Sequence, residues 1–411
     1  MAPHMRDPRI LDLARWITER GLAGVHESEI MGGVCARLAA HGVPLFRGLV
    51  GVDTLHPLLG GRVFRWWRDR GVDWSEYGRD LSSASAPAWV HSPYHHLMTT
   101  GESLYRFRYP PAGGAYPFPV LEELAEMGIT DYVACVHRLE GAANIGDLDC
   151  IFSSWASDAP DGFAAGDVAL IEGLGPFLAA AIGAAAVRQI TRTLADTYLG
   201  RDAGGRVLRG AIERGFAETI RAVIWFSDLK GFTSMVDSIE PALVIPLLND
   251  YADPQVSAIH ARGGTVLKFI GDGILAIFPV GDDAAEACGR ALAAAEEVFA
   301  SLAEVSARRA AEALPATGAY LALHVGEVSY GNIGGQDRLD FTVIGPAVNE
   351  AARISAMCRS LEQDIVVSQT FAEAARSSQA RLVPLGSHAL RGVTRAQALF
   401  ALVPEARRAD G

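Results

Sequence analysis

The sequence is poor in cysteine and lacks the paired arrangements that give cysteine a structural role. Its five cysteines are odd in number and scattered along the chain, and no two of them form a CxxC pair. A disulfide framework and a zinc ribbon are therefore excluded, and the pattern is typical of a protein from a reducing compartment.

Basic residues are outnumbered by acidic ones, and lysine is almost absent. The 411 residues hold 36 Lys and Arg against 48 Asp and Glu, and only Lys230 and Lys268 are lysines. A chain with a net charge of -12 is unsuited to coating nucleic acid or anionic lipid, so we expect neither as a partner. Because arginine occupies nearly every other basic position, a lysine in this chain is informative.

Long apolar runs are missing as well. The N-terminus carries charges every few residues, and the best uncharged stretch, residues 173–187, is shorter than the roughly 20 strongly apolar residues that a membrane span requires. We therefore predict no signal peptide, no membrane span and a cytoplasmic location.

The distribution of tryptophan and histidine divides the chain into two parts. Six of the seven tryptophans and eight of the eleven histidines precede residue 160. Apolar periodicity in this first part predicts helices at 10–20 and 28–41 and strands at 104–109, 131–137 and 149–155. We expect a domain over residues 1–165 in which helices flank a mostly antiparallel sheet.

A narrow apolar stripe follows this domain. Its members recur at steps of three and four residues, which predicts a long helix that ends at the glycine-rich run 200–205. The stripe suits either a helix packed on its own domain or a dimeric, coiled-coil-like connector, and we assign residues 166–219 to a connector helix and linker. The stripe consists of Ile171, Leu174, Leu178, Ile182, Ala186, Ile190 and Leu194.

The last part, residues 220–411, alternates between strand and helix patterns. Strands are predicted at 222–227, 265–270, 274–278 and 320–328, with helices at 241–262 and 284–311. Glycines on both sides of Asp272 indicate a hairpin between the second and third strands. The order βαββαβ is that of a ferredoxin-like α+β domain, with an antiparallel sheet and helices on one face.

Two aspartates in this part occupy unusual positions. Asp228 follows an apolar strand, and Asp272 sits in the hairpin turn. Carboxylates at strand ends can meet in space and hold one or two hard cations, and Mg²⁺ bound in this way usually completes its shell with substrate phosphates. The alternative is that Asp228 caps a helix and Asp272 is an ordinary turn residue.

Three sequence blocks carry a family resemblance. FSDLKGFT at 226–233, LKFIGDGILAIF at 267–278 and FTVIGPAVNEAAR at 341–353 resemble the signature blocks of class III nucleotidyl cyclases, in the same order and spacing. The resemblance covers about residues 220–401. It implies that Asp228 and Asp272 bind two Mg²⁺ or Mn²⁺ ions in each active site.

The same resemblance assigns the remaining site residues. Lys268 matches the lysine that reads the adenine edge, where guanylyl cyclases place Glu, and Thr342 matches the second base-reading position. Asn349 and Arg353 match the pair that orients the ribose and stabilises the transition state. Asn and Arg four residues apart project from one helix face, so one helix can supply both. Asp340 is an alternative to Thr342 as the residue facing the base.

The resemblance implies an adenylyl cyclase that converts ATP to cyclic AMP and pyrophosphate. Active sites in the family lie at a head-to-tail dimer interface, so a homodimer of this chain would form two equivalent sites. A guanylyl or dual-specificity cyclase, and a catalytically inactive nucleotide-binding regulator, are the alternatives. A diguanylate cyclase is disfavoured because the acidic GG[DE]EF turn is absent.

The first domain offers fewer signals. His91, His95 and His96 form a local cluster without cysteine or carboxylate ligands nearby, which favours a structural role over a metal or haem site. The position of the domain before a connector helix resembles that of a GAF-type sensory module. This arrangement implies regulation by an unknown small-molecule ligand.

Overall fold

The computed structural model describes residues 7–78, 86–110, 114–139, 145–146, 148–375, 381–393 and 396–402. The chain divides into two compact units, Met1–Leu194 and Ala195–Gly411. Each unit is described by itself below.

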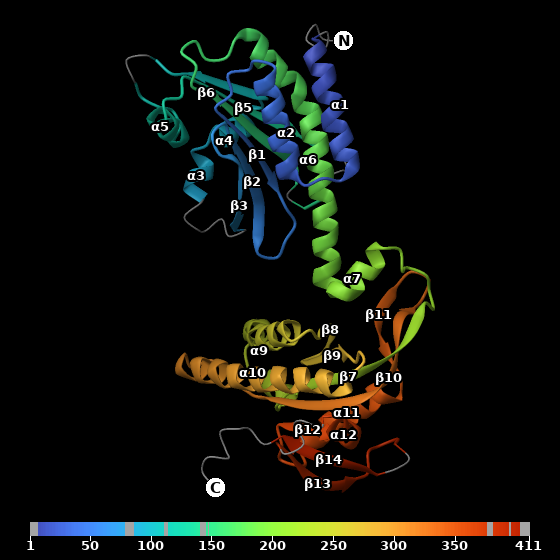
Figure 1. Cartoon of the computed structure of the whole chain (residues 1–411). Coiled ribbons are helices and arrows are strands. Elements are labelled where there is room, and N and C mark those ends of the chain that lie inside the picture. The colour runs from blue at the N-terminus through green and yellow to red at the C-terminus, as the bar shows by residue number, and fades with distance from the viewer. Residues whose placement is uncertain are drawn as a thin grey trace. The chain divides into compact units, whose positions relative to one another are not determined.

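The N-terminal unit is built on a six-stranded antiparallel sheet in the order β3-β2-β1-β6-β5-β4. Helices α1, α2 and α6 cover one face of this sheet, and the short helices α3, α4 and α5 lie on the other (Figure 1). The predicted antiparallel sheet with flanking helices is therefore present. The elements are α1 (Pro8–Ala23), α2 (Glu27–Ala40), β1 (Arg47–Asp53), β2 (Leu59–Trp67), β3 (Gly71–Gly78), α3 (Ala86–Val90), α4 (Pro93–Thr100), β4 (Leu104–Arg108), α5 (Pro119–Glu126), β5 (Asp131–Arg138), β6 (Cys150–Ser157) and α6 (Ala165–Leu199).

The apolar stripe of α6 packs on its own domain, which is the first of the two alternatives above. Its residues from Ile171 to Ile190 are buried in the same core as Leu13, Val34 and Trp155. A seam already buried in this way cannot also form a two-stranded coiled coil, so the dimeric interpretation of the stripe was wrong. By length and composition α6 could cross a membrane, but 56% of its most apolar window is buried within the structure.

The C-terminal unit begins at Ala195, within the last turns of α6, which ends at Leu199. Gly200 adopts a left-handed φ of 81°, and the glycine-rich run that follows is not irregular but forms α7 (Arg201–Leu208). The predicted βαββαβ order is then present as β7 (Ala217–Leu229), α9 (Pro241–Ala261), β8 (Thr265–Ile270), β9 (Gly273–Pro279), α10 (Ala284–Ala311) and β10 (Ala319–Gly334). Helix α9 runs without interruption through Pro246 and Pro254.

The sheet of this unit runs β13-β14-β12-β10-β7-β9-β8, and β11 pairs with β10. The order β10-β7-β9-β8, antiparallel throughout, is that of a ferredoxin-like domain. The additional elements are α8 (Phe232–Val236), β11 (Leu339–Ile344), α11 (Pro346–Cys358), β12 (Ile365–Ser368), α12 (Gln369–Ala374), β13 (Leu382–His388) and β14 (Gln397–Leu402).

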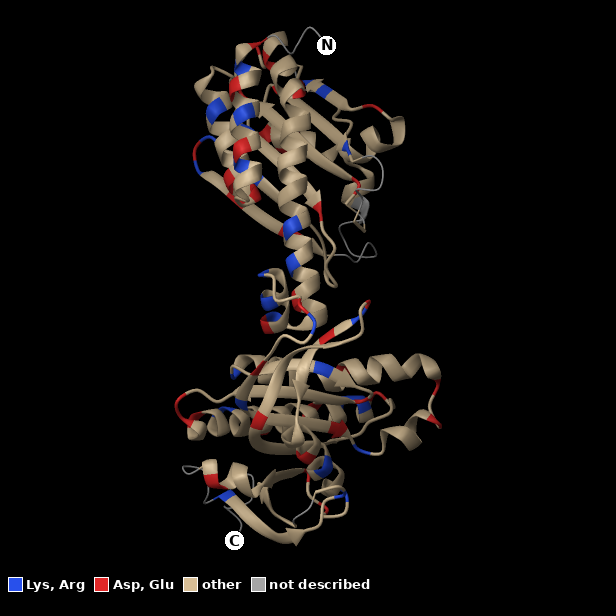
Figure 2. Cartoon of the chain, turned by 90° about the vertical axis from the view of Figure 1, so that its right-hand side faces the viewer, with Lys and Arg blue, Asp and Glu red and all other residues tan. Residues whose placement is uncertain are grey.

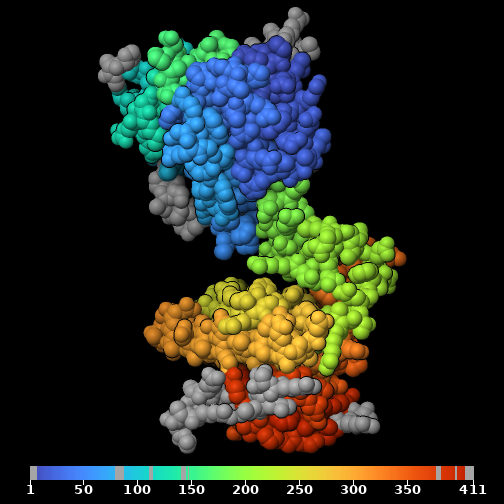
Figure 3. All heavy atoms as spheres, in the orientation of Figure 1, coloured from blue at the N-terminus to red at the C-terminus, as the bar shows by residue number. Residues whose placement is uncertain are grey.

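Helices cover both faces of this sheet, whereas the sequence predicted helices on one face only. Helices α9 and α10 cover one face and form a continuous layer, yellow to orange in Figure 3. Ala203 of α7 and Ala347 and Ala351 of α11 pack on the opposite face. The ferredoxin-like order includes only α9 and α10, whereas α7 and α11 lie outside that order and cover the second face.

Acidic and basic residues are interspersed over both units in the view of Figure 2, and no basic face is visible there.

Candidate active site

Asp228 and Asp272 come together where β7 ends and β8 turns into β9. Strand alternation directs Val223 and Trp225 of β7 toward α9 and α10, and Ala222 and Ile224 toward the opposite face, which Asp228 shares. Asp272 occupies the turn between β8 and β9. Its Oδ2 accepts a hydrogen bond from the backbone N–H of Leu229 at 3.2 Å, and its carboxyl group is hydrogen-bonded to that of Asp228.

Gly273 makes this approach of the hairpin to β7 possible. A Cβ atom at this position would lie 2.5 Å from the carbonyl oxygen of Ser227, which is closer than real Cβ contacts allow. Any other residue would therefore push the turn away from β7. The glycine that the sequence shows after Asp272 thus allows the two carboxylates to meet.

Asp272 alters the ionisation of Asp228. Partial burial of its carboxylate, followed by the hydrogen bond and the repulsion from Asp272, raises the pKa of Asp228 to about 7. Adjacent carboxylates cannot both ionise freely unless a cation lies between them. Carboxylate oxygens are also the ligands that Mg²⁺ and Mn²⁺ prefer, so the two aspartates fit a divalent-cation site.

Asn349 and Arg353 lie on the exposed face of α11. The opposite face of the helix packs on the sheet through Ala347, Ala351 and Ile354. Within the described part of the chain, neither the Asn349 nor the Arg353 side chain makes a hydrogen bond or an ion pair. The helix thus presents an amide and a guanidinium, four residues apart, to the surroundings.

The distance between α11 and the sheet depends on Gly326 of β10. A Cβ atom there would lie 2.4 Å from the Cβ of Ala347 and 3.2 Å from Nε2 of His324. His324 is buried, its Nδ1 is hydrogen-bonded to Oγ of Ser368 at 2.9 Å, and its Nε2 lies 3.6 Å from the carboxylate of Glu350. Small residues and buried polar contacts therefore set where α11 lies.

Lys268 and Thr342 are found at β8 and β11. The Lys268 ammonium forms an ion pair with Asp340, two residues before Thr342 on the same strand. The Oγ1 atom of Thr342 is buried and has no hydrogen-bond partner among the described residues. Since residues two apart in a strand share a face, Asp340 and Thr342 lie on the same side of β11.

The sequence-predicted residues therefore form three groups, namely the acid pair, the base-reading residues with Asp340, and the α11 pair. No hydrogen bond or ion pair joins one group to another within the described residues. Sequence reasoning named Asp340 only as an alternative, and nothing in the local pattern indicated its pairing with a lysine 72 residues away.

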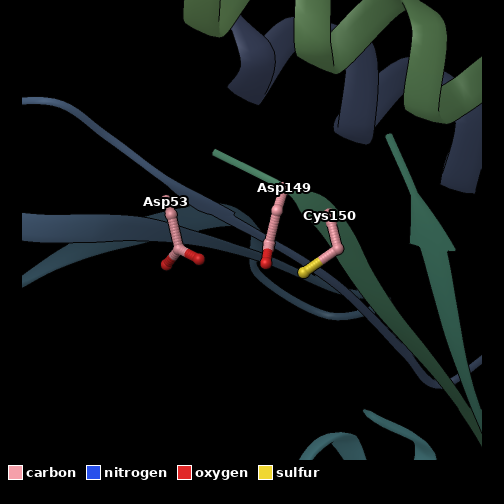
Figure 4. Close-up of side chains that lie close together, drawn as sticks. All are labelled: Asp53, Asp149 and Cys150. Carbon is pink, nitrogen blue, oxygen red and sulfur yellow. The ribbon is translucent and has the colours of Figure 1, made fainter. Parts of the chain in front are cut away.

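A group of possible metal ligands also occurs in the N-terminal unit. Figure 4 shows Asp53 at the end of β1 beside Asp149 and Cys150 at the start of β6, with ligand atoms within 4.8 Å of one another. The histidines named from the sequence are not part of this group. His95 packs edge-on against Trp89, and His96 packs in the same way against Tyr105.

Comparisons with known proteins support a class III adenylate/guanylate cyclase catalytic domain within the C-terminal unit. Residues 217–403 match the family described as the adenylate and guanylate cyclase catalytic domain.

Individual relatives are similar over this region. An adenylate cyclase of Anabaena cylindrica is 36% identical over 163 residues, which cover 39% of this chain and 32% of the relative. The adenylyl cyclase CyaB of P. aeruginosa is 21% identical, with a TM-score of 0.42, over 46% of this chain and 97% of that one. The guanylyl cyclase Cya2 is 29% identical, with a TM-score of 0.41, over 46% and 95%. The chain spans about a third of the length of the curated relatives it matches, and the similar proteins include cyclases named for either base.

Proposed function

We propose that this protein is an adenylyl cyclase, which forms 3′,5′-cyclic AMP and pyrophosphate from ATP. The observation that carries the proposal is the contact between Asp228 and Asp272, two acids that form no ion pair with a basic side chain among the residues that the structure describes. Such a pair is stabilised by a divalent cation, and two Mg²⁺ or Mn²⁺ ions are the cofactors we propose for each site.

The reaction joins the ribose 3′-oxygen to the α-phosphorus and breaks the bond from that phosphorus to the pyrophosphate oxygen, while the hydroxyl proton is released. Cations held by Asp228 and Asp272 would supply positive charge near the 3′-hydroxyl and the phosphates. Arg353 would stabilise the negative charge that grows on the α-phosphoryl oxygens, and Asn349 would orient the ribose. Both side chains are exposed and lack partners in the described chain, as groups that await a substrate would be.

Lys268 and Thr342 would read the adenine base. Adenine offers a ring-nitrogen acceptor and an amino donor at its edge, whereas guanine offers a carbonyl and a ring N–H. Lys268 can only donate, and the unpartnered hydroxyl of Thr342 can accept, so the pair suits adenine. We expect discrimination of about ten- to a few-hundred-fold in kcat/KM, the range for one or two mispaired buried hydrogen bonds.

A homodimer with shared sites accounts for the separation of the three groups within one chain. In a head-to-tail arrangement, the acid pair of one protomer would face the base-reading and α11 residues of its partner. Phe269, Ile270 and Ile344 support this proposal, because these large apolar side chains are 44–59% exposed next to the site residues.

We also propose that residues 1–165 form a cytoplasmic, GAF-like sensor that acts on the cyclase through residues 166–219. An antiparallel sheet with helices on both faces is compatible with such a module, and its ligand would be a small molecule.

Purified full-length protein, incubated with ATP or GTP and with Mg²⁺ or Mn²⁺, tests the proposal by mass-spectrometric identification of the product. We expect cyclic AMP and pyrophosphate from ATP, and far less cyclic GMP from GTP. The change Lys268→Glu should depress ATP use far more than GTP use. Equal turnover of both nucleotides by the unaltered chain would favour a dual-specificity cyclase, and no cyclic product from either would favour an inactive nucleotide-binding regulator.

A further inference from the structure

Arg47, the first residue of β1, carries a guanidinium without a counter-ion. The side chain is partly buried, its Nε is fully buried, and it makes no hydrogen bond or ion pair with any described residue. Two other arginines of this unit that are withdrawn from solvent do have acid partners. Arg62 pairs with Glu27 at 2.8 Å. Arg106 pairs with Asp131 at 2.5 Å. Because a charge taken out of water without a partner costs free energy, Arg47 is arranged unlike a residue that only stabilises the fold.

The position of Arg47 on the sheet leaves its charged end accessible. Val50 and Val52 of the same strand point into the core under α1, α2 and α6, so strand alternation places Arg47 on the opposite face, with α3, α4 and α5. Its guanidinium carbon lies 5.1 Å from the centroid of the Trp67 ring. That contact holds the side chain but satisfies none of its N–H groups. The two terminal nitrogens are not among the fully buried atoms, so an oxyanion can reach them.

Three hydroxyl groups adjoin this guanidinium. Those of Tyr94, Tyr132 and Ser154 are hydrogen-bonded to one another, and both tyrosines interact with the charge of Arg47. Burial raises the pKa of both tyrosines, so the hydroxyls remain neutral and can donate to an anion without replacing it. Glu123 of α5 attracts the guanidinium but forms no ion pair with it in the described chain.

The charge that Arg47 offers suits a carboxylate. Arg65 of β2 lies on the same face, but Ser75 accepts a hydrogen bond from it at 3.0 Å and Asp73 lies 3.6 Å away. A single unpaired guanidinium balances about one negative charge. A carboxylate carries one charge and matches the guanidinium fork, whereas a phosphate monoester carries close to two.

Aromatic side chains border the hydroxyl groups. The ring centroid of Phe152 lies 5.2 Å from that of Tyr94 and 5.3 Å from that of Trp89. Trp89 is 37% exposed, so this aromatic surface is open on one side. Apolar surface beside a few polar groups is typical of a small-molecule site, which favours a ligand with an apolar body.

We infer that the N-terminal unit binds a small organic monocarboxylate, whose carboxylate pairs with the Arg47 guanidinium and whose apolar body lies against Phe152 and Trp89. The inference deepens the proposed sensor role and rests on it for any effect on the cyclase. The binding site itself rests on the unpaired guanidinium and its neighbours.

Benzoate and hexanoate are suitable probes, one with an aromatic and one with an aliphatic body. Isothermal titration calorimetry on the full-length protein should show that at least one of them binds with a Kd of roughly 1 mM, as expected for so small a ligand. Benzyl alcohol and 1-hexanol should bind at least about tenfold more weakly, because they lack the charge. Lack of binding by both carboxylates, equal binding by the neutral alcohols, or tighter binding of phenyl phosphate than of benzoate would overturn the inference.

Substitution of Arg47 tests its role directly. Arg47→Met removes the charge and keeps much of the length, so carboxylate affinity should fall at least about tenfold. The melting temperature without ligand should stay equal or rise, because an unpaired charge is removed. Arg47→Lys keeps the charge without the fork and should have intermediate affinity. Unchanged affinity in Arg47→Met, or lost affinity with a lower melting temperature in both variants, would overturn the inference.

Arg65 provides a matched control on the same face of the sheet. Arg65→Met removes a guanidinium that already has partners, so carboxylate affinity should change less than about threefold. An equal loss of affinity in Arg65→Met and Arg47→Met would show a general effect of charge and overturn the inference.

Failure of the inference and failure of the proposed function are distinguishable, because the binding is measured without catalysis. Cyclic AMP formation with and without the bound probe tests the sensor role separately. A probe that binds through Arg47 and leaves turnover unchanged would support the site and count against the sensor role. A probe effect on turnover that persists in Arg47→Met would contradict the site.

Discussion

An aspartate at the end of a strand has oppositely charged surroundings in the two units. In the N-terminal unit, Asp131 is fully buried at the start of β5, and nearby donors compensate its charge. Arg106 donates to both of its carboxylate oxygens at 3.1 and 2.5 Å, and the backbone N–H of Phe163 donates at 2.9 Å. In the C-terminal unit, Asp228 has another acid as its neighbour.

This difference separates an acid that stabilises the fold from an acid that is arranged for a ligand. A buried charge that is paired and hydrogen-bonded is tolerated, whereas two adjacent carboxylates oppose folding unless something else neutralises them. Asp131 is fully buried among donors, whereas Asp228 lies at an exposed strand end beside another acid, so both the exposure and the sign of the nearest charges distinguish the two aspartates.

The largest effect is expected when the acids of the C-terminal pair are removed, which tests whether they serve a ligand rather than the fold. We expect Asp228→Ala or Asp272→Ala to lower cyclase turnover by about two to three powers of ten, on the scale known for single groups that stabilise transition-state charge. The melting temperature should stay equal or rise, because repulsion between the carboxylates is relieved. Steady-state assays beside calorimetry measure both effects, and a variant that keeps more than about a tenth of the activity would remove that residue from the proposed cation site.

The equivalent change in the N-terminal unit should affect stability instead. Asp131→Asn leaves Arg106 without its charged partner, and we expect the free energy of unfolding to fall by about 3 kcal/mol, at the lower end for a broken buried pair because Arg106 reaches solvent. Urea denaturation followed by circular dichroism measures this loss. A change below about 0.5 kcal/mol would mean that the compensation around Asp131 contributes little to the fold.

A mixing experiment tests whether the acid pair of one protomer forms an active site with the α11 residues of its partner. Asp228→Ala and Arg353→Ala chains should each be inactive, but random mixing should restore about a quarter of wild-type activity, because half of the dimers are mixed and each of those has one intact site. Native mass spectrometry with isotope-labelled chains verifies subunit exchange. Exchange without recovery would show that each chain builds its own site.

The smallest effect that we expect concerns a buried histidine of the C-terminal unit. Burial lowers the pKa of His324 to about 4 in the folded chain, below its ordinary value of 6.5. The unfolded chain then binds more protons, so the stability gained by keeping the ring neutral is complete above pH 6.5 and is lost as the pH falls toward 4. Glu350 offsets part of this cost by pairing with the charged ring.

We therefore expect the free energy of unfolding to drop by about 1 to 3 kcal/mol over this pH range from His324 alone. The measurement is the difference in pH dependence between the wild-type chain and His324→Gln. Parallel profiles for the two chains would contradict the prediction.

Much of the catalytic fold was predictable because its elements carry local signals. The hairpin around Asp272 follows from its flanking glycines, and α9 and α10 match their predicted ranges closely.

In the N-terminal unit, the first three strands, β1 to β3, were not predicted from the sequence. Strand β1 is buried on both faces and therefore lacks alternation, and β3 is exposed on both faces. Periodicity detects a strand only when its two faces differ.

The candidate site was predictable in its members but not in all of its contacts. Asp228, Asp272, Asn349 and Arg353 are named by motifs, and the structure adds that the acids touch and that the α11 pair is exposed. The pairing of Lys268 with Asp340 depends on how β8 and β11 are brought together by the whole sheet. Contacts between distant segments are a product of tertiary packing, which no local pattern encodes.

Gly326 has no functional group, yet it determines where α11 and its exposed polar side chains lie. There is no room for even a methyl group between β10 and α11 at this point, since a Cβ atom would lie 2.4 Å from the Cβ of Ala347. A side chain there would displace the helix by about an ångström and carry Asn349 and Arg353 with it, a shift of the size that can cost a hundredfold in rate. A search for polar groups would overlook this position, yet Gly326 fixes the distance of the Asn349 and Arg353 side chains from the sheet.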